Sequence, residues 1–428
     1  MSGFGSNERK TKKSEEKKIK TLQRDKLISN AFSLHSSGKI KEAADVYNFL
    51  IQKKIYDPRV FNNLGSIYSN LKQFDKAILL FDESIKKFPN SLEAYINLAN
   101  VMIIKGKSDI AKKILNKVIE LNPNYLKPYS NLAGIFVGEG NFEKAEFFLR
   151  RSLEINPKDI NTLVNLACVL KDLGNPKQAE RFLRDALEIN PKYDSALVNL
   201  GAVLNELGKI DEGEEFLKKA LKINPNSPMA LNNLGNILSK KNKNKEAELF
   251  YRKAIELKSD FFLAYDNLGS LLSKQGNLIE AEKFTEKAIN YNPKFELAYV
   301  NLGSIKIDLD KLLEAEELFL KAIQINENYS YAYRNLFRLY EKTNNIEKLK
   351  NKLKTLKENK SIVNEKILFQ ARIFFREKDY IKAKKSIDKV SDEWINNTDH
   401  QTNLLYWSYK AFIEEKVGNY DEAFKCFE

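Results

Sequence analysis

The stretch "AYVNLGSIK", Ala298–Lys306, places an asparagine directly before a Leu-Gly pair, and the upstream stretch "AYDNLGSLL", Ala264–Leu272, repeats the arrangement. Asparagine recurs at this place without interruption at nine evenly spaced positions. These positions are Asn63, Asn97, Asn131, Asn165, Asn199, Asn233, Asn267, Asn301 and Asn335. An unbroken series at a fixed period indicates a repeat architecture. The length of 428 residues therefore reflects the number of repeats in one elongated array.

Two helices are predicted in each repeat. We number every unit from 1 to 34, with Pro58 at position 1, and the apolar positions 4, 7, 8 and 11 then follow helical spacing. Position 8 is small almost throughout: Gly65, Ala99, Ala133, Ala167, Gly201, Gly235, Gly269 and Gly303. Position 20 is small as well, and position 24 often carries a bulky side chain such as Phe81, Tyr251 or Phe319. The pattern predicts two closely approaching backbones with the bulky side chain filling the space beside them.

Turn signals fall where a two-helix unit needs them. Glycine occupies position 15 in many units, where the first helix is expected to end. Proline occupies position 32 at Pro89, Pro123, Pro157, Pro191, Pro225 and Pro293. Because proline cannot continue a helix, it is expected to stop the second helix of each unit.

The residues at positions 4, 7, 8, 20, 24, 27 and 32 resemble the tetratricopeptide repeat. This resemblance implies an all-α fold, a right-handed superhelical solenoid of about 12 helix-turn-helix repeats. The pattern weakens in the unit that contains Asn335, where Phe337 and Leu349 replace the small residues. We expect the helix pair there to pack more loosely or at another angle.

Four segments are predicted along the chain. Residues 1–23 form a basic tail that we expect to be disordered, because it holds few large apolar residues. Residues 24–353 form a regular array of about ten repeats, and residues 354–363 break its register. Residues 364–428 hold two divergent repeats joined by "INNTDHQTN", which is predicted to be a loop. The last repeat stops inside its second helix, so we expect the sequence to be part of a longer protein.

Composition favours a soluble cytoplasmic protein. The hydrophobic fraction is 43%, and no window approaches the roughly 20 consecutive apolar residues that cross a bilayer. The N-terminus lacks the apolar core of a secretory signal. The net charge of +13 is spread along the chain apart from the tail, so no specific nucleic acid is expected as a partner. We expect a monomer.

The nine asparagines stand at position 6, and we call this series the asparagine ladder. At 100° per residue, positions 2, 5, 6, 9, 12 and 13 lie opposite the packed face of the first helix. These positions are expected to line a concave groove. An amide carries both donors and an acceptor, so the ladder is predicted to bind the backbone of an extended polypeptide. The alternative is that each asparagine bonds only to the neighbouring helix.

Two resemblances within the family bear on the ligand. The ladder is similar to that in the repeat region of O-GlcNAc transferases, which implies a polypeptide-binding groove. The dicarboxylate clamp of chaperone-binding members requires lysine at position 5, and no unit from Pro58 onward has one. Binding of a chaperone tail is therefore not expected.

No enzyme chemistry is predicted from the residues present. His35 and His400 have no metal-ligand spacing, and Cys168 has no histidine nearby to activate it. No catalytic residue, metal ligand or cofactor is therefore expected. We predict a scaffold for protein–protein interaction. The alternatives are the recognition arm of a larger transferase, similar to bacterial repeat sulfotransferases, and tethering to a membrane or nucleic acid through the tail.

Overall fold

The computed structural model describes residues 24–356, 362–397 and 400–427. Within these ranges the chain forms helices joined by turns and contains no strand. It divides into two compact units, the first ending at Lys209 and the second beginning at Ile210. The predicted basic tail, residues 1–23, lies outside the described residues. The described chain begins with a helix over 24–36.

The first unit continues from the helix over 24–36 with ten further helices. They are α2 (Ile40–Gln52), α3 (Pro58–Asn70), α4 (Phe74–Lys87), α5 (Leu92–Ile104), α6 (Ser108–Leu121), α7 (Lys127–Gly138), α8 (Phe142–Ile155), α9 (Ile160–Asp172), α10 (Pro176–Ile189) and α11 (Asp194–Glu206). The first helix of a repeat, such as α3, spans 12 or 13 residues, and the second, such as α4, spans 13 or 14.

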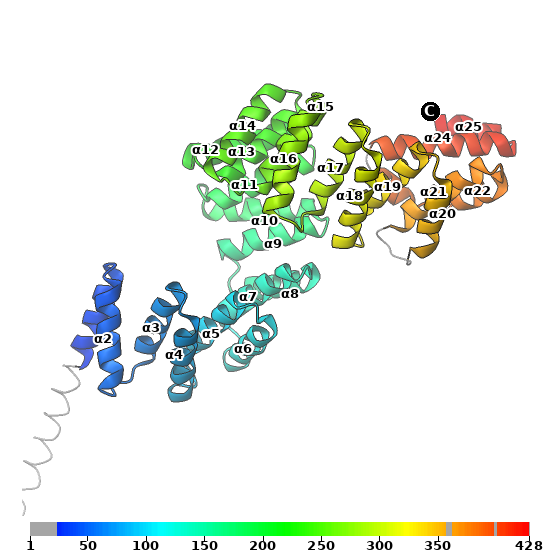
Figure 1. Cartoon of the computed structure of the whole chain (residues 1–428). Coiled ribbons are helices and arrows are strands. Elements are labelled where there is room, and N and C mark those ends of the chain that lie inside the picture. Colours follow the sequence, from blue (N-terminus) through cyan, green and yellow to red (C-terminus); the bar gives the residue numbers. More distant parts are fainter. Residues whose placement is uncertain (1–23, 357–361, 398–399, 428) are drawn as a thin grey trace, which may run out of the picture. The chain divides into compact units, whose positions relative to one another are not determined.

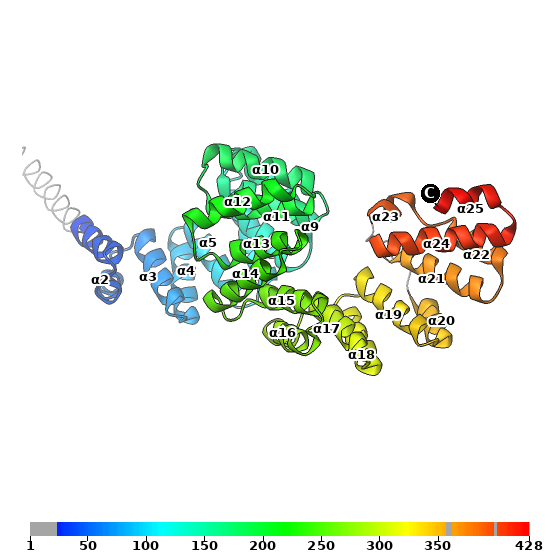
Figure 2. The same cartoon turned by 90° about the horizontal axis from the view of Figure 1, so that it is seen from above.

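The second unit carries the remaining helices. They are α12 (Ile210–Ile223), α13 (Pro228–Lys240), α14 (Asn244–Leu257), α15 (Phe262–Lys274), α16 (Leu278–Tyr291), α17 (Glu296–Asp308), α18 (Leu312–Ile325), α19 (Ser330–Lys342), α20 (Ile346–Thr355), α21 (Val363–Arg376), α22 (Tyr380–Ile387), α23 (Asp392–Asn397), α24 (His400–Val417) and α25 (Tyr420–Phe427). Consecutive helices of one repeat lie side by side, as α15 and α16 do in Figure 1 and Figure 2.

Position 15 forms the turn inside each repeat, as predicted. Gly106, Gly140, Gly174, Gly208 and Gly276 have φ between 71° and 81°. Other residues take the same left-handed conformation where glycine is missing, namely Lys72, Asn242, Asp310, Asn344 and Lys378. Position 15 therefore takes the left-handed conformation with or without glycine, because the chain turns there from the first helix into the second. The second helices end two residues before proline, as α4 does before Pro89 and α6 before Pro123.

Size complementarity between positions 8 and 24 governs the packing of each helix pair. A Cβ atom added to Gly65, Gly235 or Gly303 would stand only 2.5–2.6 Å from the ring of the aromatic residue at position 24. In three other units alanine and leucine take these two positions, as in Ala99 with Leu115, whereas the first unit combines Ala31 with Tyr47. The predicted close approach is confirmed.

Position 5 corrects the predicted concave face. The prediction placed this position opposite the packed side, but Asn62, Asn232, Asp266 and Val300 are all less than 5% exposed. The reason is that position 5 also faces the second helix: Ser84 Oγ on α4 donates to Asn62 Oδ1 on α3 over 3.3 Å. The packed face is therefore wider than the apolar positions alone indicated.

Asp266 is a buried carboxylate within this position-5 series. It is 2% exposed, and both of its oxygens accept from Asn301 Nδ2 at 3.0 Å. Burial raises the pKa of Asp266 to about 6, and the hydrogen bond from Asn301 only partly offsets that effect. One repeat earlier, Asn232 accepts from Asn267 over 2.9 Å in the equivalent arrangement, without a charge.

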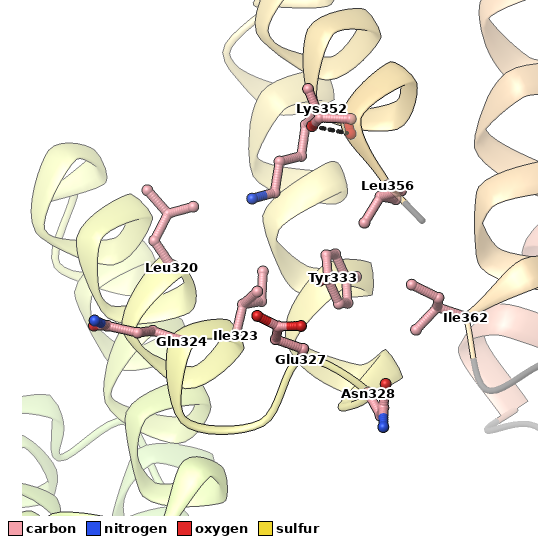
Figure 3. Close-up of a pocket in the computed structure, with 10 residues that line it drawn as sticks. Leu320, Ile323, Gln324, Glu327, Asn328, Tyr333, Lys352, Leu356 and Ile362 are labelled. Carbon is pink, nitrogen blue, oxygen red and sulfur yellow. Dashed lines mark hydrogen bonds between the residues drawn. The ribbon is translucent and has the colours of Figure 1, made fainter. Parts of the chain in front are cut away.

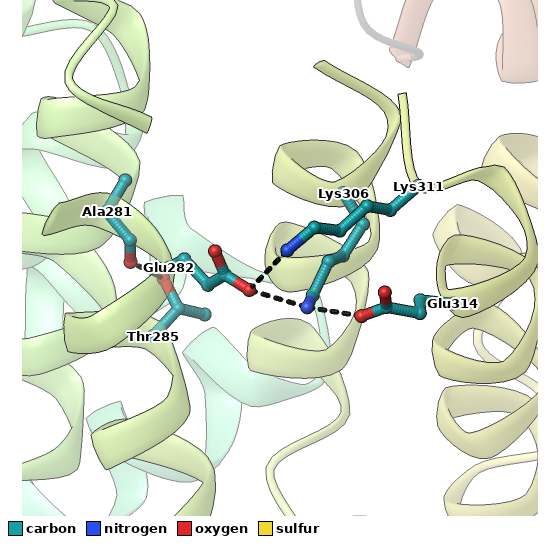
Figure 4. Close-up of polar contacts among 6 residues, drawn as sticks. All are labelled: Ala281, Glu282, Thr285, Lys306, Lys311 and Glu314. Carbon is teal, nitrogen blue, oxygen red and sulfur yellow. Dashed lines mark hydrogen bonds and ion pairs between the residues drawn. The ribbon is translucent and has the colours of Figure 1, made fainter. Parts of the chain in front are cut away.

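Lys306 is a cation at position 11, where most units have an apolar residue. It is 7% exposed and lies between Glu282 on α16 and Glu314 on α18 (Figure 4). Burial alone would lower its pKa, but the hydrogen bonds to the two carboxylates outweigh that effect and raise the pKa to about 12. The ion pairs connect one repeat to the next, as Lys241 also does with Asp211 and Glu214.

Two predictions were made for the C-terminal part of the chain, a polar loop and a break in the repeat register. The predicted loop "INNTDHQTN" is wrong over most of its length, because α23 extends to Asn397 and α24 begins at His400. Its polar side chains bond internally: Asn403 Nδ2 donates to Ile395 O over 3.1 Å, and Arg338 Nη2 donates to the buried Thr402 hydroxyl over 3.0 Å. Near the predicted register break, α20 spans 10 residues and ends at Thr355.

The pairing of positions 8 and 24 predicts a compensating double substitution. Gly303→Ala should destabilise the chain by about 1–3 kcal/mol, because the new methyl group overlaps the Phe319 ring. Adding Phe319→Leu should restore most of this loss, since an Ala–Leu pair occupies these positions in other units. Urea unfolding of the single and double variants measures the coupling.

Gly134→Ala is the matched control for that test. Gly134 is helical and has no atom within 4 Å of an added Cβ, so alanine should be neutral or stabilise by up to about 1 kcal/mol. Equal destabilisation by Gly303→Ala and Gly134→Ala would show that helical glycine itself, and not contact with Phe319, sets the cost.

The buried carboxylate predicts a pH-dependent gain in stability for Asp266→Asn. An acid whose folded pKa is raised contributes its full stability below the unfolded pKa near 3.8 and loses it as the pH rises through 6. The variant should therefore gain about 2 kcal/mol relative to wild type between pH 4 and pH 7. Urea midpoints at both pH values test this, with the exposed Asp260→Asn as a control. A constant difference between Asp266→Asn and wild type at all pH values would contradict it.

Candidate functional site

All nine ladder asparagines lie on first helices and keep part of their side chain accessible. Asn165 is exposed, and the other eight are half-buried. Their flanking residues at positions 5 and 7 are mostly buried, because those residues point into the helix-pair core. The helix thus holds one amide per repeat at the edge of the packed face.

In the first unit the ladder asparagines have different partners. Asn63 Nδ2 donates to Tyr47 Oη over 3.2 Å, and Asn131 Nδ2 donates to Asn100 Oδ1 over 2.8 Å. Asn199 Nδ2 donates to the carbonyl oxygen of Ser195, one turn earlier in its own helix, over 2.9 Å. Asn97 and Asn165 form no hydrogen bond with any residue in the described ranges.

In the second unit two ladder asparagines bond to position 5 of the preceding repeat. These are the bonds from Asn267 to Asn232 and from Asn301 to Asp266. Asn335 Nδ2 donates to Tyr331 O over 2.8 Å, and Asn233 has no hydrogen-bond partner among the residues described. The interpretation that the asparagines bond to the neighbouring helix therefore accounts for some of them and leaves others without such a bond.

The direction of these bonds is the same at every partnered asparagine. The amide nitrogen donates in all six, and no described residue donates to the Oδ1 atom of any ladder asparagine. The assignment of nitrogen and oxygen is fixed where the partner accepts only, as the Ser195 and Tyr331 carbonyls and the Asp266 carboxylate do. Each amide therefore keeps its acceptor. Each also keeps at least one N–H, apart from Asn301, whose Nδ2 donates to both Asp266 oxygens.

Position 9 lies next to the ladder and is small or polar until Arg338. Asn100 and Gly134 are exposed there, and Ser66, Cys168, Ala202, Ser270 and Ser304 are half-buried. Burial raises the pKa of the Cys168 thiol, which disfavours the thiolate that a nucleophile needs. Cys168 is therefore a small side chain beside the ladder, as predicted.

Two cavities in the described part of the chain are lined by no ladder asparagine. A cavity of 560 Å³ is lined by residues of α18, α19 and α20, among them Ile323, Tyr333 and Lys352 (Figure 3). A second cavity, of 330 Å³, lies among α19, α21 and α24 and is lined mainly by cationic side chains. The sequence prediction did not include this second cavity. The signal for it was the recurrence of cations at positions 9 and 13 of two successive units.

Neither a metal centre nor a membrane-spanning helix is found in the described part of the chain. Within it, no three His, Cys, Asp or Glu side chains come together in a way that would hold a metal ion. No helix in the same ranges has both the length and the apolar character needed to span a membrane.

Sequence comparison matches most of the chain to repeat families. A family model described as the C-terminal domain of cilia and flagella-associated protein 70 matches residues 21–266, more than half of the chain. A tetratricopeptide repeat model matches residues 263–295 and 297–329. The BBSome complex member BBS4 of Bos taurus is 35% identical over 102 residues, which are 22% of this chain and 18% of that protein. The chain thus spans about a fifth of that curated relative.

Solved structures share the fold. A tetratricopeptide repeat protein from Parabacteroides merdae superposes with a TM-score of 0.50 at 23% identity, covering 58% of this chain and 98% of its own. A human IFIT1 dimer with PPP-AAAA superposes with a TM-score of 0.52 at 19% identity, covering 93% of this chain and 87% of its own. The family-model matches and the helix-pair geometry agree. The chain belongs to the tetratricopeptide repeat family, and the model of the cilia and flagella-associated protein 70 C-terminal domain is the family model that covers more than half of it.

Proposed function

We propose that the chain is a scaffold that binds an extended polypeptide along its first helices, through the asparagine ladder. Tetratricopeptide repeats generally mediate protein–protein interaction, and the proposal adds which atoms make the contact. The observation that carries it is the common state of the ladder amides: each keeps an Oδ1 acceptor that no described residue uses, and all but Asn301 keep an unused N–H as well.

Such an amide suits a polypeptide backbone. A peptide unit offers one N–H and one carbonyl oxygen, and an asparagine side chain pairs with both at once. Recognition of the backbone depends little on the ligand's side chains, so the proposed binding tolerates many sequences. The small residues at position 9 support this proposal, because they leave room beside the ladder, as at Gly134, where an added Cβ would meet no atom within 4 Å.

The internal bonds of the ladder support the same function. Asn301 is held by the Asp266 carboxylate and Asn199 by the Ser195 carbonyl, so these amides are oriented before a ligand arrives. Orienting a polar side chain in advance lowers the entropy cost of binding. Under this proposal, a bond to the neighbouring helix and a role in binding are compatible properties of one side chain. The cytoplasmic location and the monomeric state stay predictions.

A peptide array tests the proposal with a double variant in the first unit. Asn97→Ala with Asn165→Ala removes two amides that have no hydrogen bond within the described chain, so helicity and stability should be unchanged. Peptides bound by the wild type should bind about thirtyfold more weakly, because about 1 kcal/mol is lost for each of the two hydrogen-bonded amides. Backbone N-methylation of the same peptides should weaken binding to the wild type in the same way.

The control removes two exposed asparagines outside the ladder, Asn90→Ala and Asn116→Ala. Binding by this variant should equal that of the wild type. An equal loss in both double variants, or undiminished binding of N-methylated peptides, would refute recognition of the backbone by the ladder.

A further inference from the structure

The cavity among α19, α21 and α24 is surrounded by positive charge. Its volume is 330 Å³, within the range of small-ligand sites. Its lining consists of Arg338, Glu341, Lys342, Arg372, Arg376 and Leu405. Even with Glu341 ionised, the lining carries an excess of three positive charges, and this excess attracts an anion.

The charges are brought together by the repeat register. Arg338 and Arg372 occupy position 9 of two successive units, and Lys342 and Arg376 occupy position 13 of the same units. Residues four apart share one face of a helix, and α21 packs against α19 and α24. The units before Arg338 have small or polar residues at position 9, so the cations begin in the last ladder repeat, the one that contains Asn335.

Arg372 is the central side chain of this cavity. It is 6% exposed, and its guanidinium group lies 4.9 Å from the Phe369 ring centroid and 4.6 Å from that of Tyr409. Its Nη2 atom pairs with Glu341 Oε2 at 2.5 Å. The Nε and Nη1 atoms are buried and have no hydrogen-bond partner in the described chain. A buried charged donor without an acceptor costs free energy. A ligand that brings acceptor oxygen atoms to Arg372 would remove this cost.

Glu341 does not satisfy these donors. It binds Arg372 through one oxygen, and its other oxygen, Oε1, is also buried without a partner among the described residues. Burial raises the pKa of Glu341, and the charges of Arg372, Arg376 and Arg338 only partly offset that effect. The pair is therefore incomplete on both sides, unlike a buried ion pair whose hydrogen bonds are all made.

We propose that this cavity binds a phosphate group. Phosphate offers several acceptor oxygens to the guanidinium fork of Arg372, and its double negative charge matches the excess better than a carboxylate does. Glu341 competes with the phosphate for Arg372, since both are anions that accept from the same group. This proposed site does not depend on the proposed function of the ladder, because it binds an oxyanion through cationic side chains and contains no ladder asparagine. The phosphate is either free or carried on a phosphorylated polypeptide.

Titration of the full chain with inorganic phosphate at low ionic strength tests the site, by calorimetry and by the rise in melting temperature. Lys342→Gln removes one lining charge without touching Arg372 and should weaken phosphate binding about fivefold. Glu341→Gln keeps an acceptor for Arg372 but removes the competing charge, and it should strengthen binding about fivefold.

Lys274→Gln is the matched control, because Lys274 is an exposed lysine at position 13 of an earlier unit. It removes the same charge and should leave phosphate affinity unchanged. Equal weakening by Lys274→Gln and Lys342→Gln would show attraction by the whole chain and overturn the site. Absence of saturable phosphate binding by the folded wild type, or no response to Glu341→Gln, would overturn it as well.

A second titration distinguishes the two sources of the phosphate. The probe is a glycine–serine hexapeptide with one phosphoserine, compared with its unphosphorylated form and with inorganic phosphate. Tighter binding of the phosphopeptide than of inorganic phosphate supports a phosphorylated polypeptide, and the reverse order supports the free ion. Equal binding of the phosphorylated and unphosphorylated peptides would contradict phosphate recognition.

Discussion

The close approach of the two helices in each repeat is the constraint on which the rest of the structure depends. In most units it depends on glycine or alanine at position 8, as at Gly235 opposite Tyr251, whereas the unit of Phe337 lacks the small residue. With the backbones fixed at this distance, position 5 is buried and position 6 remains at the edge of the packed face. The same constraint therefore creates the core and the line of accessible amides.

Much of this arrangement follows from the sequence, because periodic features report local geometry. The turn at position 15 and the stop before proline are determined by backbone conformations that few residues allow, so glycine and proline mark them reliably. The burial of position 5 was not predictable in the same way. The 100° rotation per residue placed Asn62 and Asp266 opposite the apolar positions, whereas their partners Ser84 and Asn301 come from another helix or another repeat.

The polar composition of residues 395–403 led to a wrong prediction near the C-terminus. Asn403 and Thr402 were expected in a loop, yet both bond to side-chain or backbone groups of other helices. The cationic cavity depends equally on which helices meet. Arg338 and Arg372 stand one full repeat apart in the sequence, and only the packing of α21 on α19 makes them neighbours. The repeat period of a single sequence indicates which side of its helix a residue occupies. It does not show which side chains of different repeats come together.

The matching of positions 8 and 24 also bears on how such an array changes over evolutionary time. Both members of each pair lie within the same repeat, so a unit carries its own complementary sizes wherever it stands in the array. Gain or loss of a whole unit keeps every pair intact, whereas exchange of half a unit can place alanine where the unit has room only for glycine, as at Gly303 beside Phe319. The complete repeat is thus the smallest segment that recombination can duplicate or delete without risking such an overlap.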